Sequence, residues 1–118
     1  MRLADYHIHY PPEPQWPNPK VLCLVGPIRF RDTFLLVYEK ESLLGQIVLM
    51  PVFTPNRLLT PEQLQICDRL HRQKIGNSHE ILVINVGGYQ GDGTRDEVAF
   101  ARSREIPVRF LVSGVSTG

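Results

Sequence analysis

Three short apolar runs constrain the fold of this chain more than any other sequence feature. They cover residues 21–25, 47–50 and 81–86, and each is followed by glycine or proline (Gly26, Pro51 and Gly87). Apolar residues fill nearly every position of these runs instead of every second one, which is typical of strands buried on both faces. The runs therefore predict a parallel sheet with helices packed on both sides.

The segments between these runs have helical patterns. An apolar stripe predicts a helix over residues 29–44, ended by Gly45. The sequence Thr60-Pro61-Glu62-Gln63 combines a capping threonine, a proline at the first helical position and a capping-box glutamine. It predicts a second helix up to about residue 75, ended by Gly76 and Asn77. A third helix is expected over residues 94–104, a fourth strand over 107–112 and a loop over 52–59.

This alternation predicts an α/β fold: a Rossmann-like (flavodoxin-like) three-layer sandwich with a mostly parallel sheet of four to five strands and right-handed crossovers. At 118 residues the chain holds one domain, which we expect over residues 20–118. Residues 1–19 contain five prolines and are expected to form an arm on the surface or against a neighbouring subunit, with Trp16 as its anchor. The arm and the exposed edges of a small sheet favour a homodimer.

Charge and hydropathy exclude several classes of protein. A formal net charge of +1 argues against a nucleic-acid-binding surface. No apolar run approaches the roughly 20 residues that span a bilayer, and the N-terminus has no apolar signal-peptide core, so we expect a cytoplasmic location. Cys23 and Cys67 are interpreted as small buried hydrophobes.

Ligands in such sheets bind beyond the carboxyl ends of the strands. After the third strand, residues 87–93 contain four glycines, so the backbone can approach a ligand and present N–H groups at the start of the next helix. The alternative is a tight turn in which glycine only supplies positive φ angles. The candidate ligand contacts are Gly88, Tyr89, Gly91, Gly93 and Thr94, joined by Gly26 and Arg29 after the first strand.

Glu97 has two interpretations. Thr94-Arg95-Asp96-Glu97 fits a capping box, in which Glu97 folds back onto the Thr94 amide. Alternatively, Glu97 is an ionised carboxylate on the ligand side of the sheet, available as a nucleophile. His71, on the second helix, is a candidate acid or base.

A metal site is not expected. Asp5-x-His7-x-His9 has the spacing that opens the metal site of amidohydrolase-like barrels, but such a barrel needs about 250 residues and further ligands from later strands. No cofactor is expected either.

Three stretches resemble the nucleoside 2-deoxyribosyltransferase superfamily, which includes the deoxynucleoside 5′-monophosphate N-hydrolases and the CMP N-hydrolases. They are VLCLVGPIRF (21–30), ILVINVGGY (81–89) and GDGTRDEVAFARSREIPV (91–108). Members of that superfamily have a strand ending in G-S-x-R and, later, E-x-G-x-A followed by K-P-V. The block from Glu97 to Ala101, followed by Ile106-Pro107-Val108, is in register with the last motif.

The resemblance implies that Glu97 is the nucleophile that attacks the anomeric carbon and displaces the base. It also implies that residues 26–29 lie against the sugar and its 5′ substituent, and that residues 91–94 help to hold that substituent. The chain departs from the pattern at Pro27, where the family has serine. The family aspartate that assists the leaving base falls, depending on register, at Asp68 or His71.

The leading hypothesis is therefore an N-ribosyl hydrolase or transferase that acts on a (deoxy)nucleoside or its 5′-monophosphate. Glu97 is its nucleophile and Asp92 or His71 its acid–base group. The alternatives are a non-catalytic nucleotide-binding or sensing domain on the same fold, and a small structural domain whose proline arm docks a partner.

Overall fold

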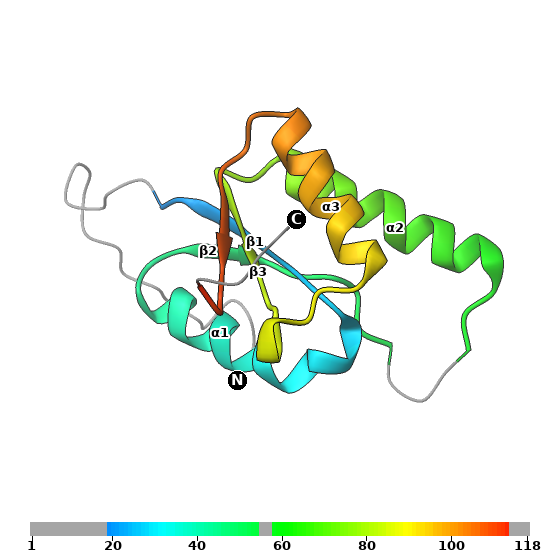
Figure 1. Ribbon diagram of the computed structural model, residues 1–118, viewed down its shortest axis with the longest axis horizontal. Helices are drawn as coiled ribbons and strands as arrows, with labels where there is room; N and C mark the ends of the chain where they lie inside the picture. The colour runs from blue at the N-terminus through cyan, green and yellow to red at the C-terminus, as the bar shows by residue number, and fades with distance from the viewer. Residues whose placement is uncertain (1–18, 55–57, 114–118) are drawn as a thin grey trace, which may run out of the picture.

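The computed structural model describes residues 19–54 and 58–113. The described part is an α/β domain built on a four-stranded, all-parallel sheet in the order β2-β1-β3-β4 (Figure 1). The strands are β1 (Val21–Val25), β2 (Ile47–Leu49), β3 (Glu80–Val83) and β4 (Val108–Phe110). The helices are α1 (Arg31–Leu43), α2 (Pro61–Gly76) and α3 (Asp92–Ser103), with short 3-10 turns η2 (Ile28–Phe30) and η3 (Val86–Gly88). The predicted Rossmann-like three-layer sandwich is confirmed, and the strand order is that of flavodoxin-like folds.

The two faces of the sheet carry separate hydrophobic clusters, because successive strand residues point to opposite sides. On one face Cys23, Val25, Ile81 and Val83 pack against Ile75 of α2 and against Val98 and Ala101 of α3. On the other face Leu22, Leu24, Leu82 and Ile84 pack against Phe34 of α1. Figure 1 shows the same layers, with α1 on one side of the sheet and α2 and α3 together on the other. Filling both faces is what the uninterrupted apolar runs predicted.

Helix α2 begins where the capping box predicted. The Thr60 hydroxyl accepts a hydrogen bond from the Gln63 backbone N–H at 3.1 Å, and the Gln63 side chain accepts one from the Thr60 N–H at 2.9 Å. These two bonds satisfy amide donors that have no partner inside a helix.

Helix α3 begins two residues earlier than predicted, at Asp92, with Gly91 as its N-cap. Gly91 has a φ of 82°, which a residue with a side chain adopts only with strain. Thr94 is consequently a buried residue of the first turn and not the cap, so the predicted Thr94–Glu97 capping box is wrong.

The prediction that the run at residues 47–50 is buried on both faces is wrong for strand β2. Among the described residues it is an edge strand that pairs only with β1, and Ile47 is 46% exposed, so it is not buried on both faces. Strand order depends on contacts far apart in the sequence, which an apolar run does not encode. β3 and β4 are also shorter than predicted. After β3, the Asn85 side chain takes the place of the backbone pairing: it accepts a hydrogen bond from the Val112 N–H at 2.9 Å and donates one to the Val112 carbonyl at 3.1 Å.

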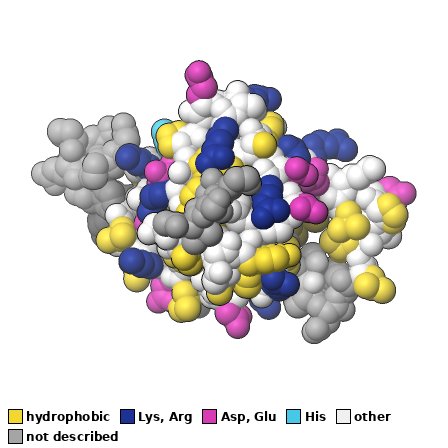
Figure 2. Space-filling view, in the orientation of Figure 1, with side chains coloured by type: hydrophobic (Ala, Val, Ile, Leu, Met, Phe, Trp, Pro, Cys, Tyr) yellow, Lys and Arg dark blue, Asp and Glu magenta, His cyan; other side chains and the backbone are white. Residues whose placement is uncertain are grey.

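Several predictions lie outside the described residues: nearly all of the proline-rich arm, Trp16, and the Asp5, His7 and His9 motif. Within the described part, no helix is long and apolar enough to cross a membrane. On the face shown in Figure 2, Lys and Arg side chains are scattered among Asp and Glu and do not gather into one basic patch.

Candidate active site

A cavity of about 760 Å³ opens at the carboxyl ends of β1, β2 and β3. Four segments line it: the turn after β1, the chain after β2, residues 64–71 of α2 with the chain leading into that helix, and the glycine-rich turn with the first turns of α3. The cavity therefore lies where parallel α/β sheets generally bind ligands.

Gly26 lies tightly against the chain that follows β3. A Cβ atom at this position would lie 2.8 Å from the Ile84 carbonyl oxygen, a distance that real contacts do not allow. The chain therefore turns out of β1 directly against the segment that follows β3. This packing fixes the cavity wall formed by Gly26, Pro27 and Ile28.

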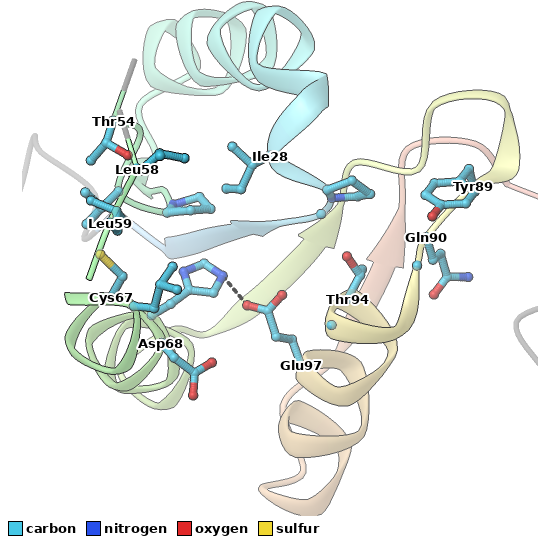
Figure 3. A pocket seen from close by; sticks show the side chains of 18 residues that line it. Ile28, Thr54, Leu58, Leu59, Cys67, Asp68, Tyr89, Gln90, Thr94 and Glu97 are labelled. Atoms are coloured by element: carbon cyan, nitrogen blue, oxygen red, sulfur yellow. Dashed lines mark ion pairs between the residues drawn. The ribbon is translucent and has the colours of Figure 1, made fainter. Parts of the chain in front are cut away.

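Glu97 points into the middle of the cavity and does not fold back onto its own helix (Figure 3). Its Oε2 atom lies 2.7 Å from His71 Nε2, which comes from α2. Both side chains are largely buried, with exposed fractions of 16% for Glu97 and 8% for His71. The two helices thus bring a carboxylate and an imidazole together from positions 26 residues apart.

The contact between Glu97 and His71 is close but not well directed. Although Glu97 Oε2 lies 2.7 Å from His71 Nε2, neither ring nitrogen of His71 has a hydrogen-bond partner of acceptable geometry within the described part of the chain. A buried imidazole without directed partners is costly.

The remaining α2 residues of the cavity follow from helical spacing. Cys67 and His71 are four residues apart, so they lie on one face of α2, and both line the cavity. Asp68 also lines the cavity, but its carboxylate is 67% exposed and lies 3.6 Å from Arg72 on the next turn. Of the two positions that the resemblance offers for an acid, the structure brings His71, not Asp68, into contact with Glu97.

Behind Glu97 the core is strongly apolar. Burial raises the pKa of the Cys23 thiol from 9.0 to about 12, and the negative charge of Glu97 adds to this rise. A hydrogen bond from the Ser78 side chain and the positive charge of Lys74 lower the same pKa by smaller amounts. The Lys74 ammonium donates a hydrogen bond to the Met50 carbonyl at 2.7 Å and so ties α2 to the end of β2. Glu97 is thus placed between a low-dielectric core and an open cavity.

The cavity collects most of the predicted site residues: Glu97, His71, Gly26, Tyr89, Gly91, Gly93 and Thr94. Asp92 is not among them. Asp92 is the first residue of α3, where its carboxylate is fully exposed and lies 3.8 Å from Arg95 on the same helix. Gly88 lies in η3, outside the cavity lining.

Arg29 is likewise outside the lining. Its guanidinium stacks on the Tyr89 ring, 4.1 Å from the centroid, and lies 5.2 Å from the centroid of Phe30. The ring of Tyr89 lines the cavity, so Arg29 is separated from the cavity by one aromatic side chain.

One whole end of the cavity was not predicted from the sequence. This end is made mainly by apolar residues: Ile28, Pro51, Val52, Leu58, Leu59 and Leu64, together with Thr54 and Cys67. The available signal was the apolar pair Leu58-Leu59 directly before the capping box of a helix, in a segment that was predicted only as a loop. Gln90, which is only 4% exposed, was also missed at the other end.

The described residues contain no group of three or more His, Cys, Asp or Glu side chains able to hold a metal ion. What they do contain is a carboxylate beside an imidazole, above an apolar core and next to a glycine-rich helix start. No protein-family model matches this chain, and no curated protein sequence matches it significantly.

Proposed function

We propose that this protein is an N-ribosyl hydrolase or transferase that cleaves the N-glycosidic bond of a (deoxy)nucleoside or its 5′-monophosphate. The observation that carries the proposal is the position of Glu97. Its carboxylate faces a ligand-sized cavity and contacts His71 at 2.7 Å, and it does not cap its own helix. The resemblance of residues 97–108 to the nucleoside 2-deoxyribosyltransferase superfamily gives this carboxylate its proposed role as a nucleophile.

The reaction would proceed in two steps, as in retaining glycosidases. Glu97 attacks C1′ of the sugar, the bond from C1′ to the base nitrogen breaks, and its electron pair leaves with the base, which takes a proton from the acid–base group. Water, or a second base in a transferase, then attacks C1′, gives a proton back to that group, and releases the Glu97 carboxylate. His71 is the proposed acid–base group, since it is the titratable side chain in contact with Glu97.

The start of α3 would hold the sugar and its 5′ substituent. Gly91 and Gly93 leave backbone N–H groups accessible there, and the helix start carries a partial positive charge that favours an anion. Thr94 and Gln90 add polar side chains at the same end of the cavity. This arrangement favours a 5′-monophosphate over a free nucleoside.

The experiment is a panel of nucleosides and nucleoside 5′-monophosphates, with ribose and deoxyribose, in which free base is measured by chromatography at high enzyme concentration. Base release is expected from at least one nucleotide, and Glu97→Gln should lower it at least about 10³-fold. Asp92→Asn is the matched control, because Asp92 lies on the same helix outside the cavity. Base release that survives Glu97→Gln would refute the assigned nucleophile.

A covalent intermediate supplies a second readout. A 2′-fluoro-arabino nucleotide slows hydrolysis of the glycosyl ester, so mass spectrometry should find the sugar attached to the peptide that contains Glu97. In Glu97→Ala, azide should restore part of the activity by taking the place of the carboxylate. Neither result is expected if Glu97 only organises the fold.

One observation favours the second candidate, a non-catalytic nucleotide-binding or sensing domain. Pro27 lines the cavity where the resembling enzymes have serine, which removes a hydroxyl and an amide donor. This candidate predicts nucleotide binding by calorimetry without base release in the wild-type protein. A homodimer in the cytoplasm is part of the proposal under either candidate, and analytical ultracentrifugation tests the oligomeric state.

A further inference from the structure

Lys74 has an unusual environment for a lysine. It lies in the last turn of α2, where a basic side chain ordinarily extends into solvent near the free carbonyl groups of the helix end. Here the side chain is partly buried, and its ammonium donates a 2.7 Å hydrogen bond to the carbonyl of Met50, directly after β2. Removing an ammonium from water costs free energy. A neutral donor could make the same bond at a lower cost, so the charge itself needs an explanation.

The part of α2 that carries Lys74 also carries His71. Residues three and four apart share one side of a helix, so His71, Lys74 and Ile75 lie on the side of α2 that faces the sheet, and His71 and Ile75 are buried there. The Ser78 hydroxyl, just after the helix, donates a 2.6 Å hydrogen bond to the Lys74 carbonyl. Lys74 is therefore held through its backbone and its side chain, one turn from the imidazole that contacts Glu97.

The contact between His71 and Glu97 depends on the position of α2 over the sheet. It joins α2 and α3, which pack on the same face (Figure 1). Neither ring nitrogen of His71 has a well-directed partner among the described residues, so no directed bond of its own holds the imidazole. Helix α3 packs against β3 and β4, whereas Lys74 ties α2 to the chain after β2, at the opposite edge of the sheet. Lys74 thus holds α2 on the side away from α3.

The charge of Lys74 acts in the same region as the charge of Glu97. Burial raises the pKa of the Cys23 thiol, the carboxylate of Glu97 raises it further, and the ammonium of Lys74 lowers it. Both charges therefore act on one buried thiol beneath the cavity, where little water screens them. The ion pairs found among the described residues do not include Lys74, so no carboxylate of that part of the chain neutralises it by contact.

We infer that Lys74 is a positioning residue, whose charged hydrogen bond to the Met50 carbonyl holds α2 where the His71 imidazole meets Glu97. Its effect on the reaction rests on the proposed function, in which His71 gives a proton to the leaving base. A charged donor makes a hydrogen bond about twice as strong as a neutral one, which accounts for an ammonium at this position. Because a misplacement of about 1 Å can cost about 10²-fold in rate, Lys74→Met should lower kcat for a nucleotide at least about tenfold.

The kinetic test separates a positioning role from a general loss of stability. It compares the nucleotide that releases base with the 4-nitrophenyl glycoside of the same sugar 5′-phosphate, at a temperature at which circular dichroism shows every variant to be folded. 4-Nitrophenolate leaves without taking a proton, so its release does not need the acid His71. Lys74→Met should therefore behave like His71→Gln: it should lower kcat for the nucleotide and leave the release of 4-nitrophenolate nearly unchanged.

Further variants complete this test. The double variant His71→Gln/Lys74→Met should lose no more kcat than His71→Gln alone, because Lys74 acts through His71. Lys40→Met, at an exposed position of α1, is the matched control and should keep the wild-type kcat. If Lys74→Met does not fold, Lys74→Gln, which keeps a neutral donor, should show the same pattern at smaller amplitude.

An NMR measurement distinguishes failure of this inference from failure of the proposed function. The chain has four histidines, so the ring signals of His71 are assigned by comparison with His71→Gln. Glu97→Gln should shift these signals in the otherwise wild-type protein and much less in Lys74→Met, where the two side chains no longer meet. If no nucleotide releases base but this difference is found, the proposed reaction fails and the positioning role stands.

Two outcomes overturn the inference. One is that Lys74→Met lowers kcat equally for the nucleotide and the 4-nitrophenyl glycoside, or lowers neither. The other is that Glu97→Gln shifts the His71 signals equally with and without Lys74.

Discussion

The packing of Gly26 against Ile84 gives a prediction whose size follows from the structure. In Gly26→Ala, the new Cβ would lie 2.8 Å from the Ile84 carbonyl oxygen and 3.1 Å from the Ile84 Cβ. Ile84 cannot move away cheaply, because it is fully buried and its N–H donates a 2.7 Å hydrogen bond to the Val25 carbonyl. Either the end of β1 or the segment after β3 must therefore shift.

Two costs contribute to the effect on the free energy of unfolding. Overpacking a close-packed site costs about 1–3 kcal/mol. Gly26 also has a φ of 153°, and holding a residue with a side chain in the backbone region reserved for glycine costs about 1–3 kcal/mol. We expect Gly26→Ala to lose at least about 2 kcal/mol, which corresponds to a melting temperature about 8 °C lower for a chain of this size.

Two other glycines separate these costs. Gly45 has a φ of 91°, but a Cβ added there would meet no atom of the described residues within 4 Å, so Gly45→Ala measures strain without a clash. Gly76 is helical and has the same open space among the described residues, so Gly76→Ala should be neutral or stabilising by up to about 1 kcal/mol. Urea denaturation followed by circular dichroism measures all three variants. If Gly26→Ala is no less stable than Gly45→Ala, the contact with Ile84 is not rigid and the reasoning about this cavity wall fails.

Three further predictions concern the groups around the site. Thr60→Ala removes the side-chain cap of α2 and should cost about 1 kcal/mol in urea denaturation; an unchanged midpoint would mean that the cap contributes nothing. Lys74→Met removes the charged donor to the Met50 carbonyl and should cost about 1.5–3 kcal/mol, whereas Lys40→Met, at an exposed position of α1, should leave the midpoint within about 0.5 kcal/mol. Cys23 has a folded pKa raised from 9.0 to about 12, so its thiol is harder to ionise in the folded state. Its contribution to stability is therefore complete below pH 9 and is lost at up to about 1.4 kcal/mol per pH unit between pH 9 and pH 12. Cys23→Ala should show a shallower loss of stability over that range, and equal slopes would contradict the raised pKa.

The sequence by itself determined the local features of this protein. Uninterrupted apolar runs placed the strands, because burial on both faces leaves no polar alternation. The capping box placed the start of α2, because its hydrogen bonds join residues only three apart. The same local reasoning predicted the glycine-rich turn after the third strand, but for Glu97 it left a capping box as the alternative, and only the resemblance favoured a position in a site.

Only the tertiary structure decided how the site is assembled. Helix α3 starts at Asp92 and not at Thr94, so Asp92 belongs to the exposed first turn and Thr94 is buried inside the helix. Asp92 consequently faces solvent, and Glu97 meets His71 across two helices. The edge position of β2 and the apolar end of the cavity also depend on packing between distant segments. Such contacts are set by which buried surfaces fit together, and no short stretch of sequence encodes that fit.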